Sequence, residues 1–167
     1  FSSETILQAL DMGAVGVIAP HIINANQAAD LVKLSHFGNG GRGFAGATRW
    51  AGYGQKTMAE VLAQSDRETV VIAQIEEPEA LANVEEIASI EGIDGLFLGP
   101  SDMSVSMGHS NTNSQELLDA LKRVGEASLA AGKAYMTFVP NAAKAADWAE
   151  YGPHMFFVGS EQGWMKA

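Results

Sequence analysis

The chain of 167 residues contains no cysteine. Disulfide bridges and metal sites built from thiolates are therefore excluded. The absence of cysteine suits any cellular compartment, and we take the cytoplasm as the default location. Long apolar runs are also absent, because no stretch approaches the ~20 residues that a membrane-spanning helix needs. We therefore expect no partnership with a membrane.

Positively charged residues are few. The chain has 10 lysines and arginines against 20 aspartates and glutamates, which gives a formal net charge of −10. This balance argues against nucleic acid and anionic membranes as partners, because both carry negative charge. Small anionic substrates stay compatible with it, since a bound metal ion can reverse the sign of the potential inside a pocket.

The remaining composition is that of a folded globular domain. Hydrophobic residues make up 47% of the chain, and 167 residues are the length of one domain. We therefore expect a single domain over residues 1–167. The chain opens on Phe1 rather than on methionine, and it closes soon after a predicted strand without a capping signal. We expect from this that it is a piece of a longer chain.

Short apolar segments alternate along the chain with segments of helical periodicity. The apolar segments predict five strands, at residues 14–19, 70–76, 96–98, 133–139 and 155–158. The helical patterns lie at residues 2–12, 24–35, 55–64, 77–90, 114–132 and 141–151. This alternation predicts an α/β protein with a parallel sheet and right-handed crossovers.

Two α/β architectures are compatible with the alternation: an open doubly wound sheet, and part of a (β/α)₈ barrel with three units missing. Dinucleotide-binding doubly wound sheets carry the motif G-x-G-x-x-G directly after a strand. No predicted strand is followed by that motif here, and the glycines at residues 38–43 follow a helix. Polar residues end several strands, and barrel sites collect residues from many strand ends. The pattern therefore favours the barrel.

A glycine-rich segment at residues 36–53 is predicted to be an irregular loop. Loops of this length in a compact domain are more often functional than idle. Arg42 and Arg49 flank the segment; they either bind the acid group of a substrate or form salt bridges that anchor the loop or join subunits, and we favour salt bridges. His21, at the end of the first predicted strand, is either a pocket wall or an exposed loop residue.

The strand at residues 70–76 and the strand that follows it both end in acidic residues. Gln74 and Glu76 are two residues apart, so both point to the same side of their strand. The next strand is followed by Gly99, Pro100, Ser101 and Asp102. Two carboxylates at the ends of parallel strands predict either a hard-metal site or an acid/base pair.

Each of these residues also has a simpler interpretation. Glu76 can be a solvated acid that precedes the helix beginning at Pro78. Asp102 can be the N-cap of the turn after Gly99 and Pro100. Gln74 can be an ordinary interior residue that forms hydrogen bonds. Taken singly, none of the three residues establishes a site.

Three consecutive segments together resemble the HpcH/HpaI aldolase/citrate lyase family. They are VVIAQIE at residues 70–76, ALANVEEI at residues 80–87 and EGIDGLFLGPSDMS at residues 91–104. Their specific part is the pairing of Gln-x-Glu with Gly-Pro-Ser-Asp, and the likeness extends across essentially the whole chain. Within the family, the chain looks like the class II pyruvate aldolases that act on 2-keto-3-deoxy sugar acids and 4-hydroxy-2-oxo acids.

The resemblance implies a (β/α)₈ barrel of which the present strands are the fourth to the eighth. It implies that Glu76 and Asp102 are the protein ligands of a divalent metal ion, Mg²⁺ or Mn²⁺, with Co²⁺ also possible. Gln74 would contact the substrate or a metal-bound water. The backbone N–H groups of Ser101 and Asp102 would receive the pyruvate carboxylate. The family's catalytic histidine base and its pyruvate-binding arginine belong to earlier strands and are not present in this chain.

The function implied by the resemblance is a metal-dependent aldolase that reversibly cleaves a 2-oxo-4-hydroxy acid to pyruvate and an aldehyde. Family members commonly form hexamers, so we expect a homo-oligomer. One alternative is an acyl-CoA lyase of the citrate or malyl-CoA lyase type, which requires a basic patch for the CoA phosphates. The ten lysines and arginines are scattered, which disfavours it. Another alternative is a non-catalytic barrel fragment that acts as an interaction module.

Overall fold

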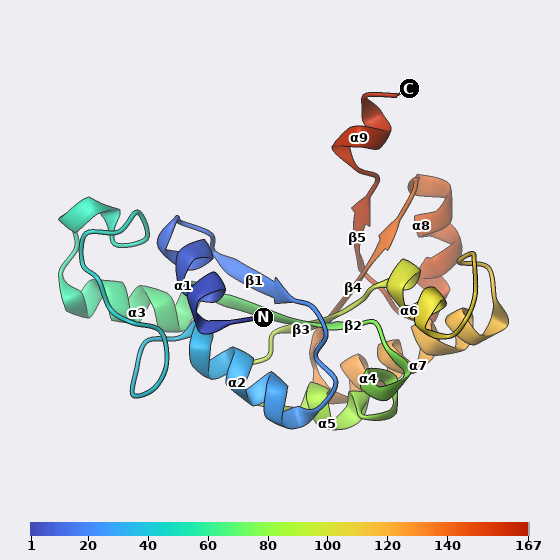
Figure 1. Ribbon diagram of the computed structural model, residues 1–167, viewed down its shortest axis with the longest axis horizontal. Helices are drawn as coiled ribbons and strands as arrows, with labels where there is room; N and C mark the ends of the chain where they lie inside the picture. The colour runs from blue at the N-terminus through green and yellow to red at the C-terminus, as the bar shows by residue number, and fades with distance from the viewer. Residues whose placement is uncertain (167) are drawn as a thin grey trace.

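Five strands and the helices between them alternate along the chain in the computed structural model, which describes residues 1–166 (Figure 1). The strands are β1 (Gly16–Ala19), β2 (Val70–Ile75), β3 (Gly95–Leu98), β4 (Ala134–Val139) and β5 (Met155–Val158). The α-helices are α1 (Ser3–Asp11), α2 (Ala25–Ser35), α3 (Met58–Glu68), α4 (Pro78–Ala82), α5 (Val84–Ser89), α6 (Pro100–Ser106), α7 (Gln115–Ala131), α8 (Ala142–Trp148) and α9 (Glu161–Trp164). Two 3₁₀ helices are η1 (Gly52–Gly54) and η2 (Ala149–Tyr151).

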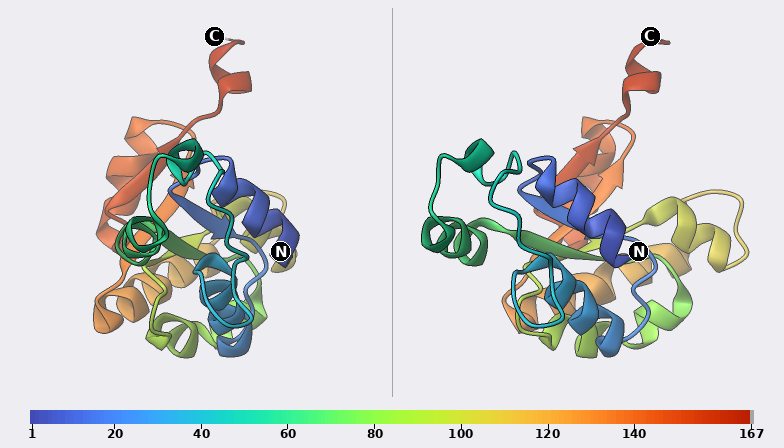
Figure 2. Two further views of the ribbon diagram at one scale, coloured as in Figure 1. Left: turned by 90° about the vertical axis from the view of Figure 1, so that its left-hand side faces the viewer. Right: turned by 60° about the vertical axis from the view of Figure 1, so that its left-hand side comes forward.

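The five strands form one sheet whose order follows the chain, β1-β2-β3-β4-β5, and every neighbouring pair is parallel. In a doubly wound sheet the strand order changes direction at a switch point. A strand order that follows the chain throughout is typical of a barrel. Right-handed crossovers that always advance in one direction leave their helices on one face. Helices α2, α4, α5 and α7 indeed lie under one face of the sheet, and the side views agree (Figures 1 and 2). The predicted α/β half-barrel is confirmed.

The main hydrophobic core lies between the sheet and these helices. Alternate side chains of the three central strands are buried there, because successive residues of a strand point to opposite faces. They are Val71, Ala73, Ile75, Leu96, Leu98, Tyr135 and Val139. The helices contribute buried leucines, isoleucines and valines to the same cluster, including Leu31, Ile87, Leu121 and Val124.

The other face of the sheet is apolar but only partly covered. Phe97 and Phe157 meet on it edge to face, with ring centroids 5.4 Å apart. Ile18 and Met155, which also alternate with core residues, are 39% and 50% exposed. In a closed barrel this concave face is the interior, where side chains from alternate strands form layers.

Two helix boundaries differ from the prediction for local reasons. The helix predicted over residues 55–64 begins later, at Met58, because Thr57 and Glu60 form a capping box. The helix predicted over residues 77–90 is divided at Asn83, whose side-chain Nδ2 donates to the Ile23 carbonyl at 2.9 Å.

Other parts of the prediction hold with small shifts. The helix expected to end before Gly132 does so, with Gly132 in the left-handed region at φ 66°. The last predicted helix ends at Trp148 and continues only as the 3₁₀ turn η2. Within residues 1–166, none of the helices is both long enough and apolar enough to cross a lipid bilayer.

Tyr135 joins β4 to α7 and provides a test of the packing. Its ring is 1% exposed, and its hydroxyl donates to the Leu121 carbonyl at 3.0 Å. Burial raises the pKa of the Tyr135 phenol, because the phenolate would be charged in an apolar site. We expect Tyr135→Phe to lower the free energy of unfolding at neutral pH by about 1 kcal/mol, since one hydrogen bond is lost and the ring remains.

The raised pKa also fixes the sign of the pH dependence. A group whose pKa is higher in the folded state stabilises the fold below its unfolded value, and that stability is lost as the pH rises above about 10. Denaturant titrations at pH 7 and pH 10.5 should therefore show a smaller alkaline loss in Tyr135→Phe than in the wild type. The exposed Tyr53 supplies the control Tyr53→Phe, and an equal alkaline loss in all three proteins would contradict the prediction.

Candidate active site at the carboxyl ends of β2 and β3

The ends of β2 and β3 bring Gln74, Glu76 and Gly99 together. Ile75 pairs with Leu98, so Glu76 and Gly99 leave the sheet at the same level. A Cβ atom on Gly99 would lie 3.0 Å from Oε2 of Glu76 and 3.1 Å from Nε2 of Gln74. Position 99 therefore leaves just enough space for these two side chains at the edge of the sheet.

The Glu76 carboxylate is 2% exposed and is held by neutral donors. The His21 backbone N–H donates to its Oε1 at 3.0 Å, and the Gln74 amide Nε2 donates to its Oε2. Buried carboxylates are normally compensated by a cation as well as by hydrogen bonds. No lysine or arginine within residues 1–166 forms an ion pair with Glu76. Within these residues its ion-pair contact is with the His21 ring, whose Nδ1 lies 3.2 Å from Oε1 and is charged only if the ring is protonated.

His21 follows β1 and lies beside Glu76. Its ring Nδ1 is 2.8 Å from Oε1 of Glu77 and 3.2 Å from Oε1 of Glu76. The residue has a left-handed backbone, with φ 58°, which is uncommon for residues other than glycine. The sequence left His21 as either a pocket wall or a loop residue; the structure adds its contacts with both glutamates. Its position just after the strand-ending Pro20 was the one available signal.

Helix α6 carries Ser101 and Asp102 in its first turn. Pro100 is the first helical residue, and Gly99 is the N-cap without a side-chain cap bond. Asp102 is therefore not the N-cap, and that alternative interpretation is wrong. The first helical hydrogen bond runs from Met103 N–H to the Gly99 carbonyl at 2.9 Å, so the N–H groups of Ser101 and Asp102 have no acceptor inside the helix. Both residues are exposed.

The donor set fits a hard divalent cation. Within residues 1–166, histidine, aspartate and glutamate side chains form no group of three or more that could hold a metal ion. Mg²⁺ and related ions, however, are commonly bound by one or two carboxylates, with water and substrate oxygens completing the coordination. Glu76, buried without a lysine or arginine, and Asp102, exposed at the start of α6, could supply such a pair.

Arg42 and Arg49 lie at the opposite edge of the sheet. Asp11 ends α1, which leads to the amino end of β1, and its Oδ1 is 2.5 Å from Nη2 of the buried Arg42. The Arg42 guanidinium also lies over the rings of Phe37 and Trp50, at 4.5 Å and 5.4 Å from their centroids. This confirms the loop-anchoring interpretation of Arg42.

Arg49 shares that location. Its side chain lies against Gly13, directly after α1, so close that a Cβ on Gly13 would be 3.0 Å from its Cδ. Neither Arg42 nor Arg49 is near Glu76 in this chain. The ion pair with Asp11 supports the anchoring role for Arg42, whereas Arg49 is exposed and its role stays a prediction.

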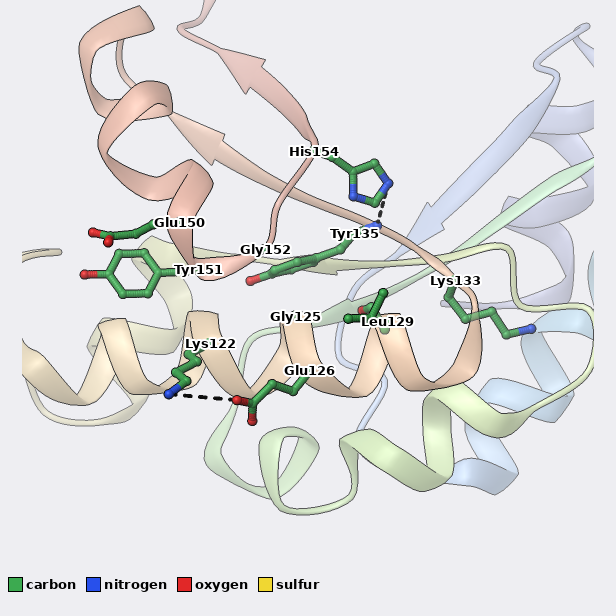
Figure 3. A pocket seen from close by; sticks show the side chains of 11 residues that line it. Lys122, Gly125, Glu126, Leu129, Lys133, Tyr135, Glu150, Tyr151, Gly152 and His154 are labelled. Atoms are coloured by element: carbon green, nitrogen blue, oxygen red, sulfur yellow. Dashed lines mark hydrogen bonds and ion pairs between the residues drawn. The ribbon is translucent and has the colours of Figure 1, made fainter.

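A hollow of about 270 Å³ lies between α7 and η2, away from Glu76 (Figure 3). Tyr135, near the start of β4, and His154, just before β5, form part of its wall, so it lies at the amino ends of these strands. It therefore lies at the edge of the sheet opposite to Glu76. No residue assigned to the site from the sequence lines it.

Comparison with known proteins identifies the family of the chain. A family model described as HpcH/HpaI aldolase/citrate lyase matches residues 1–166. A hydroxypyruvate/pyruvate aldolase from Delftia acidovorans is 36% identical over 164 residues, which cover 93% of this chain and 59% of that protein. A 5-keto-4-deoxy-D-glucarate aldolase from an Enterobacter species is 31% identical over 160 residues, covering 95% of this chain and 62% of the relative. The chain thus spans about three-fifths of the length of these relatives.

A solved structure agrees with the fold. The crystal structure of an HpcH/HpaI aldolase/citrate lyase family protein from Burkholderia cenocepacia superposes with a TM-score of 0.92 and 31% identity. The superposition covers 99% of this chain and 66% of that protein. The half-barrel described above is therefore shared with that protein in nearly all of its residues.

Gly99→Ala tests the packing at the candidate site. The new methyl group would press on the ends of Glu76 and Gln74, and Glu76 cannot retreat without loosening its bond from His21 N–H. We expect the free energy of unfolding to fall by about 1 kcal/mol through overpacking. Gly43→Ala is the matched control, because no atom lies within 4 Å of its Cβ position. Equal stability of the two variants in denaturant titrations would contradict the close packing of Gly99.

Proposed function

Because the chain belongs to the HpcH/HpaI aldolase/citrate lyase family, we propose that it carries the metal-binding part of a pyruvate aldolase. The reaction is the reversible cleavage of a 2-oxo-4-hydroxy acid to pyruvate and an aldehyde. The observation that supports this most strongly is the buried Glu76 carboxylate, which has hydrogen bonds but no lysine or arginine partner within residues 1–166. The names of the aldolase relatives support the substrate class.

Glu76 and Asp102 are the proposed ligands of Mg²⁺ or Mn²⁺, and their oxygen donors also suit Co²⁺. The bound cation supplies Lewis-acid stabilisation of the negative charge that carbon–carbon cleavage puts on the keto oxygen of the substrate. Gln74 donates its amide N–H to Glu76 and so fixes the carboxylate. Its amide oxygen has no hydrogen-bond partner within residues 1–166 and can accept one from the substrate.

Ser101 and Asp102 are the proposed binding site for the pyruvate carboxylate. Their backbone N–H groups point out of the first turn of α6 without helical acceptors. Such groups are good partners for an anion, and they follow Gly99, whose Cβ position is 3.0 Å from Oε2 of Glu76. The carboxylate and the keto oxygen of one pyruvate would thereby be held by neighbouring strand ends.

We also propose that residues 1–167 are the fourth to eighth units of a single (β/α)₈ barrel domain. Five strands wound in chain order and the 66% coverage of the Burkholderia protein support this proposal. A homo-oligomer, a hexamer by family resemblance, is supported by α9, which projects from the sheet (Figures 1 and 2). The apolar Trp164 and Met165 are 70% and 78% exposed there, which is typical of a surface that packs on another subunit.

Glu76→Gln and Asp102→Asn test the ligand assignment. Each removes one charged oxygen ligand, so we expect Mn²⁺ affinity to fall at least tenfold and metal-stimulated turnover to be lost, with the far-UV circular dichroism unchanged. The affinity is measured by titration of free Mn²⁺ with electron paramagnetic resonance. Glu79→Gln removes an exposed carboxylate from the first turn of α4 and is the control. Wild-type affinity in either test variant would refute the assignment.

Removal of metal tests the reaction class. In a longer chain that supplies the histidine and arginine of the earlier strands, pyruvate release from 4-hydroxy-2-oxo acids and 2-keto-3-deoxy sugar acids, followed with lactate dehydrogenase and NADH, should stop in EDTA. It should return when Mg²⁺ or Mn²⁺ is added in excess, because the cation carries the charge stabilisation. Pyruvate release that persists in EDTA would contradict a metal-dependent aldolase.

A further inference from the structure

We propose that the ring of His21 binds a hydroxyl group in the aldehyde half of the substrate and thereby selects 2-hydroxyaldehydes. This inference rests on the proposed aldolase function, because it needs pyruvate bound beside Glu76. Three features of His21 carry it: its strained backbone, the fixed orientation of its ring, and its position in the row of strand ends.

The backbone of His21 indicates that the side chain is required. A left-handed conformation is unfavourable for a residue with a Cβ atom, and glycine adopts it without strain. The hydrogen bond from His21 to Glu76 is donated by the backbone N–H, so glycine would keep it and lose only the contacts of the ring with Glu76 and Glu77. The side chain is 66% exposed, so burial in the core does not explain it either. Strained residues with no packing role are often found at functional sites.

The ring is oriented by Glu77. Nδ1 lies 2.8 Å from Oε1 of Glu77, and an ionised carboxylate only accepts hydrogen bonds, so Nδ1 carries the proton in this contact. Glu77 is the N-cap residue of α4, yet its side chain makes no cap bond. Nε2 of His21 has no hydrogen-bond partner within residues 1–166 and can form a hydrogen bond with a hydroxyl group, which both donates and accepts. A substrate hydroxyl is a suitable partner.

The order of the strands puts His21 on the aldehyde side of the site. His21 follows β1, Glu76 follows β2, and Ser101 and Asp102 follow β3, and these three strands are neighbours in this order. A pyruvate carboxylate bound by α6 lies on the β3 side. The rest of a 2-oxo-4-hydroxy acid then extends past Glu76 toward β1. The carbons that become the aldehyde are those that reach His21.

Two acceptors that differ by a single hydroxyl group test the proposal. Aldol addition of pyruvate to 2-hydroxypropanal and to propanal is measured with Mn²⁺, and the ratio of their kcat/KM values is the readout. We expect the wild type to favour 2-hydroxypropanal about tenfold, the effect of one hydrogen bond. His21→Gly, which keeps the backbone bond and relieves the strain, should bring the ratio close to one.

Three more variants complete the test: two change the ring or its anchor, and one is a control. His21→Asn also tolerates the left-handed region but lacks the ring, and it should behave like His21→Gly. Glu77→Ala leaves the ring without its anchor and should lower the ratio in part. His154→Asn changes a histidine at the opposite edge of the sheet and should leave the ratio at the wild-type value. An equal loss with both acceptors in His21→Gly would mean a purely structural role and would overturn the proposal.

Two readouts distinguish a failure of this proposal from a failure of the proposed function. Metal-dependent exchange of the pyruvate methyl protons in D₂O, followed by NMR in a longer chain that supplies the histidine and arginine of the earlier strands, needs no aldehyde. Its absence would overturn the aldolase function, whereas its presence with an unchanged ratio in His21→Gly would overturn only the role of His21.

Thermal unfolding without metal is the second readout. We expect His21→Gly to melt at or above the wild-type temperature, and a lower temperature would show that the ring serves packing instead.

Discussion

The buried carboxylate of Glu76 is the constraint on which the site depends. A carboxylate that is 2% exposed must be stabilised by its surroundings, and three neighbouring strand ends contribute to this. His21 supplies a backbone N–H from the end of β1, Gln74 supplies an amide from β2 itself, and Gly99 provides space at the end of β3. Each contribution depends on the parallel register of the strands, because a shift of one residue would turn Gln74 to the other face. The sheet therefore determines the position of the charge.

The same winding separates the site from the parts that stabilise the fold. All five strands run in one direction, so their carboxyl ends share one edge and their amino ends the other. Two stabilising residues lie toward the amino edge. Arg42 lies over the rings of Phe37 and Trp50 and is paired with Asp11, and Tyr135 is hydrogen-bonded to α7. Barrels commonly divide function and stability between their two ends in this way. Arg42 anchors the glycine-rich loop at the amino end.

The sequence predicted local features and missed those that depend on distant contacts. The strands were visible as apolar runs, and the spacing of two between Gln74 and Glu76 placed both side chains together, as their hydrogen bond shows. The division of the helix at Asn83 could not be predicted, since it depends on a carbonyl sixty residues away in the chain. The same holds for His21, which meets Glu76 across 55 residues and from a left-handed backbone that no sequence rule assigns to histidine.

Charge also explains why a cation belongs in the proposed mechanism. The chain has a net charge of −10, and the pyruvate carboxylate would be bound beside Glu76 and Asp102, two further negative groups. Within residues 1–166 the arginine that is most deeply buried, Arg42, is committed to Asp11 at the other edge. Neutral N–H donors at α6 can orient an anion but cannot offset two carboxylates. A divalent cation held by the two carboxylates would offset their negative charge and attract the substrate carboxylate. Binding of the anionic substrate would therefore depend on the cation.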